Sequence, residues 1–218
     1  MQLPRAEAHY SVRVNYGTYL SCRLRQAKSP FATDVRAVTD AVEKAGEDLN
    51  HLHRPVQEAL ADRDAIDDTL DLVAQQARLA LASRGLDATK KSPYTNIFPE
   101  GIGYYTAAPL DKEVQRYGEL RTRLIEVLTP EDPVRASAVP AIEKGLAAFT
   151  AAVAALEKAR TEESLAATRL ETAEEAFDRQ IERVYGTLLS EMGRAAADRF
   201  FPRMSSRRDK KDDGESHG

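Results

Sequence analysis

Residues 41–44, Ala41-Val42-Glu43-Lys44, recur 100 positions later as Ala141-Ile142-Glu143-Lys144. Further pairs keep the same order along the chain at a separation of 100 or 101: Leu20 and Leu120, Leu24 and Leu124, Pro30 and Pro130, and Tyr16-Gly17 and Tyr117-Gly118. Self-similarity in a fixed order is the signature of a duplicated structural unit. The sequence therefore predicts two repeats, at about residues 8–99 and 111–202.

Composition alone could produce some of these matches, because both halves are rich in Ala, Glu, Arg and Leu. The conserved order and the matched prolines favour duplication over that explanation. Toward the end of the repeats the separation grows to 107, as in Asp71 and Asp178. The extra seven residues are one heptad, which lengthens a packed helix without rotating its apolar face.

From residue 35 to residue 80, apolar or small residues recur at alternating steps of three and four, with Arg63 as the polar exception. This spacing is typical of a helix that packs along a partner helix. Pro55 removes a backbone hydrogen bond but does not shift the pattern. We expect one kinked helix from Thr33 to Arg84, with a break at His53–Arg54 as the alternative.

The same pattern predicts a second long helix from about Ser137 to Phe200, and a short helix from Lys112 to Leu128 capped by Asp111. The duplication extends the short-helix prediction to Ala8–Ala27, whose alternation taken alone resembles a strand. The predicted fold class is all-α: an elongated, antiparallel, coiled-coil-like bundle of two tandem helical hairpins with pseudo-two-fold symmetry. Residues 1–202 are expected to form this single domain.

Composition and charge exclude several classes. The chain of 218 residues carries 30% charged residues and a net charge of −4, which gives no sign of a nucleic-acid-binding surface. Cys22 is the only cysteine, which fits a reducing compartment, so we expect a cytoplasmic protein. No uninterrupted apolar run approaches the roughly 20 residues that cross a bilayer, so no membrane span is expected. The polar stretch 203–218 is predicted to be a disordered tail.

Residues 92–110 are the one long stretch without helical periodicity, and we expect an ordered loop there that joins the repeats. Proline, glycine and aromatic residues dominate it. The loop could cap the end of the bundle or recognise a protein partner. Capping is favoured, because Phe98-Pro99 recurs as Phe201-Pro202 at the end of the other repeat. The candidate partner-binding residues are Tyr94, Ile97, Phe98, Tyr104 and Tyr105.

Each repeat carries acidic residues at helical spacing on its long helix. The candidate metal ligands are Asp64, Asp67 and Asp71 in the first repeat and Glu171, Glu174 and Asp178 in the second. Carboxylates four residues apart lie on one helix face and can bind a divalent ion or a basic partner. They flank the apolar positions and no histidine accompanies them, so a solvated face is the favoured interpretation.

No motif indicates catalysis: the sequence has no phosphate-binding glycine loop, no zinc-spaced Cys and His set and no nucleophile elbow. We therefore expect a non-enzymatic scaffold or adaptor, without catalytic residues or cofactors, that mediates protein–protein interaction or assembly. A homodimer would cover the parts of the long helices that extend beyond the short ones. The alternative is a metal- or anion-responsive binding protein that uses the acidic groups, and a third is an enzyme whose pocket forms at a dimer interface.

Overall fold

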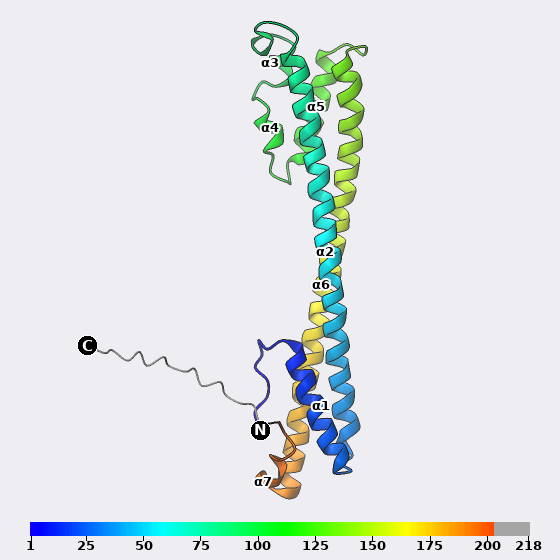
Figure 1. The fold of residues 1–218 in the computed structure, drawn as a ribbon, viewed down its shortest axis with the longest axis vertical. Coiled ribbons are helices and arrows are strands. Elements are labelled where there is room, and N and C mark those ends of the chain that lie inside the picture. Colours follow the sequence, from blue (N-terminus) through cyan, green and yellow to red (C-terminus); the bar gives the residue numbers. More distant parts are fainter. Residues whose placement is uncertain (203–218) are drawn as a thin grey trace, which may run out of the picture. The chain divides into compact units, whose positions relative to one another are not determined.

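The computed structural model describes residues 1–202. Helices make up 79% of the described residues, which contain no strand, and this confirms the all-α prediction. The elements in chain order are α1 (Tyr10–Gln26), α2 (Phe31–Ala82), the 3-10 helix η1 (Ala88–Lys90), α3 (Tyr94–Ile97), α4 (Gly103–Thr106), α5 (Glu113–Val127), α6 (Pro133–Met192) and α7 (Arg194–Ala197) (Figure 1). The predicted tail, residues 203–218, lies outside the described residues.

The chain divides into two compact units. Unit 1 contains residues 1–50 and the chain from residue 165 onward, and unit 2 contains residues 51–164. Helices α2 and α6 contribute to both units, whereas α1 belongs to unit 1 and α5 to unit 2. Each unit is therefore built from parts of both predicted repeats.

Helix α2 runs without interruption through Pro55, so the prediction of a continuous helix is confirmed and the alternative break is wrong. Its ends lie within two residues of those predicted. Several of its buried apolar residues stand at multiples of seven: Val35 and Val42 in unit 1, and Val56, Leu70 and Ala77 in unit 2. The spacing of three and four therefore located the buried face of this helix correctly.

Helix α6 differs from the prediction at both ends. It begins at Pro133, four residues early, because proline suits the first helical position and Asp132 Oδ1 accepts the Val134 N–H at 2.9 Å. It ends at Met192 and not near Phe200, because Gly193 adopts a positive φ of 75° that terminates the helix. The single turn of α7 follows directly.

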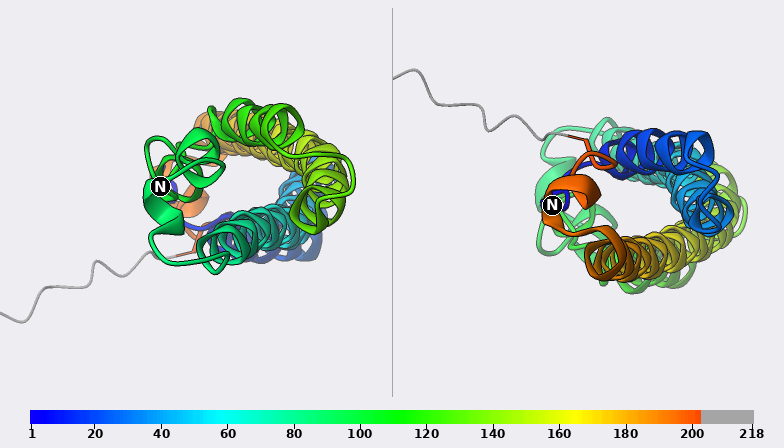
Figure 2. Two further views of the ribbon diagram at one scale, coloured as in Figure 1. Left: turned by 90° about the horizontal axis from the view of Figure 1, so that it is seen from above. Right: turned by 90° about the horizontal axis from the view of Figure 1, so that it is seen from below.

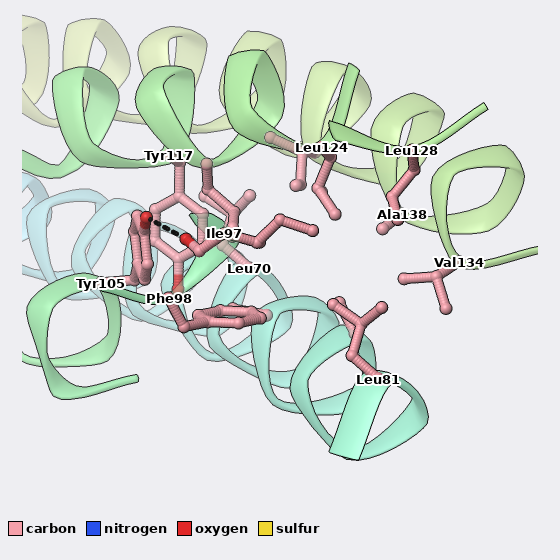
Figure 3. Packing of buried hydrophobic residues seen from close by; sticks show 14 of the residues in the cluster. Leu70, Leu81, Ile97, Phe98, Tyr105, Tyr117, Leu124, Leu128, Val134 and Ala138 are labelled. Carbon is pink, nitrogen blue, oxygen red and sulfur yellow. Dashed lines mark hydrogen bonds between the residues drawn. The ribbon is translucent and has the colours of Figure 1, made fainter. Parts of the chain in front are cut away.

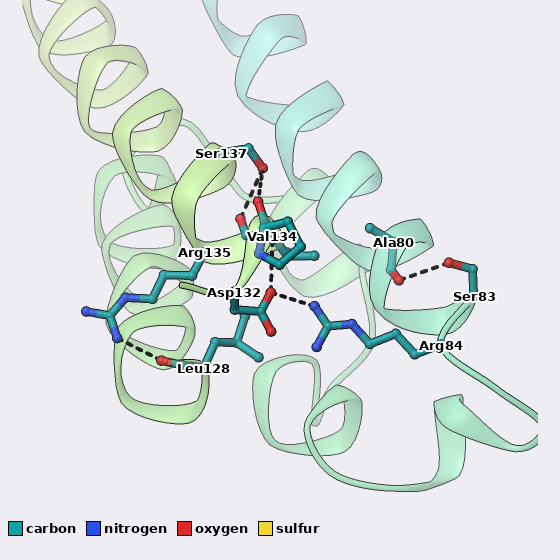
Figure 4. A network of polar contacts seen from close by, with 9 residues as sticks. Ala80, Ser83, Arg84, Leu128, Asp132, Val134, Arg135 and Ser137 are labelled. Carbon is teal, nitrogen blue, oxygen red and sulfur yellow. Dashed lines mark hydrogen bonds and ion pairs between the residues drawn. The ribbon is translucent and has the colours of Figure 1, made fainter. Parts of the chain in front are cut away.

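Asp132 also joins α6 to the end of α2 within unit 2. Arg84 Nη2 donates to Asp132 Oδ1 at 2.6 Å, and this contact holds the pKa of Asp132 below its usual value (Figure 4). Beside it, Arg135 Nη1 donates to the carbonyls of Ile125 at 2.9 Å and Leu128 at 2.7 Å, at the end of α5. Arg84 and Arg135 thus connect the neighbouring ends of α2, α5 and α6 by hydrogen bonds.

The short helices are present as predicted, apart from one cap. The N-terminal segment is helical from Tyr10 despite its strand-like alternation, and the His9 ring accepts the Ser11 N–H at 3.3 Å. Helix α5 begins at Glu113. Lys112 occupies its cap position without a side-chain hydrogen bond, so the prediction that Asp111 caps this helix is wrong.

The segment between α2 and α5 is more helical than predicted, since η1, α3 and α4 each complete about one turn within it. In the end-on view of Figure 2 (left), this segment lies on the side of α2 and α5 that faces away from α6. Ile97, Phe98 and Tyr105 from it are buried in the core of unit 2, against Tyr117 and Leu124 of α5 (Figure 3).

By length and composition alone, α6 could also cross a membrane. Its most apolar 18-residue window has a mean hydropathy of 1.4, and 22% of that window is buried in the structure. Core helices of soluble proteins can meet the same criteria. One such helix does not contradict the absence of a membrane span, which stays a prediction.

Candidate cation site

Glu113, the first residue of α5, is a buried carboxylate in unit 2. The residue is only 2% exposed, and its Oε1 atom has no hydrogen-bond partner in the described part of the chain. Burying an unpaired ionised carboxylate costs on the order of several kcal/mol of folding free energy. Proteins usually avoid this cost by pairing the group with a positive charge or by protonating it. The environment of Glu113 therefore requires a positive partner or a proton.

Two carboxylates of α2 lie next to Glu113. Asp67 and Asp71 are one helical turn apart, half-buried, and each brings an oxygen within 4.8 Å of the others and of a Glu113 oxygen. Oxygens that share one cation at metal–oxygen distances of about 2.0–2.6 Å lie no more than about 5 Å apart. The three carboxylates are thus close enough to bind one ion together.

Tyr117 fixes the orientation of one of these carboxylates. Its phenol is buried on α5, one turn after Glu113, and donates a 2.5 Å hydrogen bond to Asp71 Oδ1. Hydrogen bonds of this kind hold a metal ligand in position from outside the coordination sphere. Tyr117 therefore belongs to the site as a positioning residue.

The site carries excess negative charge. Burial, a hydrogen bond with Asp67 and the charges of Asp67 and Asp71 together raise the pKa of Glu113 to about 8. Burial also raises the pKa of Asp71, although the Tyr117 hydrogen bond opposes this effect. Arg116 lowers the Glu113 pKa only in part, since its Nη1 donates to the Tyr104 carbonyl at 2.6 Å. A proton or a cation would relieve the repulsion.

The chemistry of the donors restricts which cation fits. All three ligands are carboxylate oxygens, and neither histidine nor cysteine belongs to the group. Hard cations such as Mg²⁺, Ca²⁺ and Mn²⁺ prefer such oxygen sets, whereas Zn²⁺ and Cu²⁺ favour nitrogen and sulfur ligands. Glu113 and the two aspartates could hold a hard divalent ion between α5 and α2.

Unit 1 contains a related acidic pair with a different partner. Glu174 and Asp178 of α6 are half-buried and contact Arg13 of α1, whose side chain is 4% exposed. Arg13 Nη2 lies 3.1 Å from Asp178 Oδ2, and its Nη1 lies 3.4 Å from Glu174 Oε1. The nearby phenol of Tyr16 is buried without a hydrogen-bond partner in the described residues. Arg13 already offsets part of the negative charge of Glu174 and Asp178.

The structure separates the six acidic candidates. Asp64 and Glu171 are exposed, as the prediction of a solvated face requires, and Asp64 pairs with the adjacent Arg63. For the other four, a solvated face is wrong, because they point toward the short helices. Glu113 was not among the candidates. Its position 100 residues after Arg13, at the start of the second short helix, is the sequence signal that could have identified it.

The candidate partner-binding residues lie mostly inside unit 2. Ile97, Phe98 and Tyr105 are at most 3% exposed, while Tyr94 and Tyr104 are half-buried. Tyr105 donates to the Ile97 carbonyl at 2.9 Å and accepts from Arg123 at 2.7 Å. This arrangement favours the capping interpretation of the segment over recognition of a partner.

No protein-family model, no curated protein and no solved structure matches this chain. Since a fold by itself does not define an activity, the function has to be inferred from the geometry and chemistry of the site.

Proposed function

We propose that this chain is a non-enzymatic helical protein that binds one hard divalent cation through Asp67, Asp71 and Glu113. The observation that carries this proposal is the buried Glu113 Oε1, which accepts no hydrogen bond from the described residues 1–202 and lies beside two further carboxylates. A cation supplies the missing partner and offsets the repulsion among three negative charges. The sequence predicted either a scaffold or a metal-responsive binding protein. The geometry gives the metal-responsive function the stronger support, and only at the acidic group of unit 2.

The proposed architecture is a duplicated helical hairpin, arranged as an antiparallel, coiled-coil-like bundle. Leu20 and Leu24 of α1 are fully buried in unit 1, as are Leu120 and Leu124 of α5 in unit 2. In both units, acidic residues of a long helix face the short helix. These matched positions support duplication, and a cytoplasmic location accords with the lone cysteine.

Calorimetry on the full chain, stripped of metal with a chelator, tests cation binding. Mg²⁺, Ca²⁺ and Mn²⁺ are titrated separately into the wild type and into Glu113→Gln, with Glu174→Gln in unit 1 as the matched control. One ion should bind per wild-type chain, and an ion at 100 times its dissociation constant should add about 2.7 kcal/mol of stability. Glu113→Gln should lose at least about tenfold in affinity, and Glu174→Gln should bind like the wild type. Absence of binding at millimolar ion, or equal binding by Glu113→Gln, would refute the proposal.

A scaffold function has separate support from the surface of unit 2. Leu72 and Leu79 stand two turns apart on one face of α2 and are 52% and 58% exposed. Large apolar residues that share an exposed face are typical of protein interfaces. We propose that a second copy of this chain covers this face.

Light scattering over a range of protein concentrations tests self-association at this face. If a second copy covers it, the wild type should become a dimer as concentration rises, and Leu72→Gln/Leu79→Gln should stay monomeric. The matched control is Leu165→Gln, at an exposed leucine of unit 1. A wild type that is monomeric at high concentration would exclude the homodimer.

A further inference from the structure

The acidic pairs of the two units face partner residues of opposite charge. In each unit, two acidic residues four apart on a long helix face the first turns of a short helix. The short helix of unit 1 supplies Arg13, whereas that of unit 2 supplies Glu113. We propose that Arg13 is a built-in replacement for the cation, so that an arginine docks α1 in unit 1 where a bound ion docks α5 in unit 2. This inference rests on the proposed cation binding.

Sequence position supports the equivalence of the two residues. Arg13 and Glu113 are separated by 100 positions, as are the buried pairs Leu20 and Leu120 and Leu24 and Leu124. Each also stands about one turn before a buried tyrosine, Tyr16 in α1 and Tyr117 in α5. The exchange of arginine for glutamate therefore falls at matching places in the two repeats.

The charge balance of the two units also agrees with the replacement. The guanidinium of Arg13 contacts both Glu174 and Asp178, which leaves the group in unit 1 with a formal charge of −1. The three carboxylates of unit 2 carry a formal charge of −3 when ionised, and one divalent ion brings that group to −1 as well. An ion in unit 2 thus reproduces the electrostatic environment that Arg13 provides in unit 1.

The inference also restricts where the ion acts. Glu113 is the first residue of α5, and α5 packs against α3 and α4. Removal of the ion should therefore loosen the start of α5 and the segment before it, while α1 stays docked through Arg13. Binding of one ion per chain, and not two, follows from the same reasoning.

Reciprocal substitutions test the replacement in the full chain. Glu113→Arg should place a guanidinium beside Asp67 and Asp71, abolish ion binding and make the melting temperature insensitive to chelator. Arg13→Glu should create a second three-carboxylate group, raise the number of bound Mn²⁺ or Ca²⁺ ions from one to two, and become dependent on the ion for stability. The double variant should bind one ion. Arg13→Gln is the control, because it loses the guanidinium but adds no charged ligand.

The outcomes separate the inference from the proposed function. If the wild type binds no ion, cation binding itself fails and the inference falls with it. If the wild type binds one ion but Arg13→Glu gains no second ion, or gains no more than Arg13→Gln, the inference alone is overturned.

Arg13→Glu is refolded in 10 mM ion and its helicity is measured by circular dichroism. Failure of the ion to restore the fold also overturns the inference. Glu113→Lys repeats the test of Glu113→Arg with a second basic residue. If both variants still bind the ion, the inference is contradicted.

Discussion

The phenol of Tyr117 donates a hydrogen bond to Oδ1 of Asp71, 2.5 Å away, and so connects α5 to a carboxylate of α2. The matching phenol of Tyr16 in unit 1 is buried and makes no hydrogen bond within the described residues. The two tyrosines, which are 101 positions apart, therefore differ in their relation to the neighbouring acids. One positions a candidate ligand and the other fills space.

Replacing Tyr117 by phenylalanine should weaken cation binding about 10- to 100-fold, because Asp71 loses the hydrogen bond that orients it. Tyr16→Phe is the control. It removes a hydroxyl that has no partner, so it should leave cation affinity unchanged and stability equal or slightly higher. Calorimetric titration of both variants measures the difference. Equal affinities in the two variants would show that Tyr117 does not position Asp71 for an ion.

The stability of the ion-free chain should fall as pH rises from about 4.5 to about 8. The folded chain keeps a proton on Glu113 up to a pKa of about 8, whereas an unfolded chain releases it near the ordinary value of 4.5. The folded state binds more protons throughout this range, so raising the pH favours unfolding. Urea unfolding at a series of pH values, with chelator present, measures this slope.

A divalent ion should reverse this trend, because it competes with the proton on Glu113 and binds more tightly as that proton leaves. Glu113→Gln should flatten the dependence and remove the effect of the ion. Asp132, whose pKa Arg84 holds down, contributes with the opposite sign, mostly below about pH 4. Stability that rises between pH 5 and pH 8 in the ion-free wild type, or the same slope in Glu113→Gln, would contradict the placement of the proton.

Gly17 and Gly118 occupy matching positions in the two repeats but tolerate a side chain differently. A Cβ at Gly17 would lie 2.7 Å from Phe177 Cε2 and would overlap Oγ1 of the fully buried Thr39. A Cβ at Gly118 would meet no atom within 4 Å. Gly17→Ala should therefore destabilise the protein by about 1–3 kcal/mol. Gly118→Ala should stabilise it by up to about 1 kcal/mol, because alanine favours the helix.

Thermal unfolding followed by circular dichroism measures both variants. For a chain of this size, a change of 1 kcal/mol shifts the melting temperature by about 2–4 °C. The two shifts should have opposite signs. A neutral Gly17→Ala would mean that α1 does not approach α2 and α6 closely in unit 1.

The sequence predicted those parts of the fold that depend on local periodicity. In α2, steps of three and four residues identified the buried face, and the pattern stayed in phase across Pro55, where the helix is indeed continuous. The duplication correctly assigned a helix to Tyr10–Gln26, where local alternation resembled a strand. The end of α6 was missed because a single backbone conformation, the positive φ of Gly193, overrides a helical pattern that continues beyond it.

The candidate site was predictable only in part. Asp67 and Asp71 were identified because helical spacing places residues four apart on one face. Glu113 comes from another helix more than 40 positions away, and only tertiary packing brings it to them. The same limitation applies to Arg13, which forms ion pairs with Glu174 and Asp178 across 161 and 165 positions. No local sequence pattern distinguishes the acidic pair that faces an arginine in unit 1 from the acidic pair that faces a glutamate in unit 2.

Phe98 distinguishes capping of unit 2 from recognition of a partner. Its ring is 3% exposed and packs edge-on against Tyr105, with ring centres 5.7 Å apart. Phe98→Ala should therefore destabilise the chain by about 3–5 kcal/mol, the usual cost of truncating a buried phenylalanine. Leu86→Ala, at a residue that is 94% exposed, is the control and should change stability by no more than about 0.5 kcal/mol. Urea unfolding measures both. A Phe98→Ala chain with wild-type stability would show that the ring does not cap the unit and would return Phe98 to the partner-binding candidates.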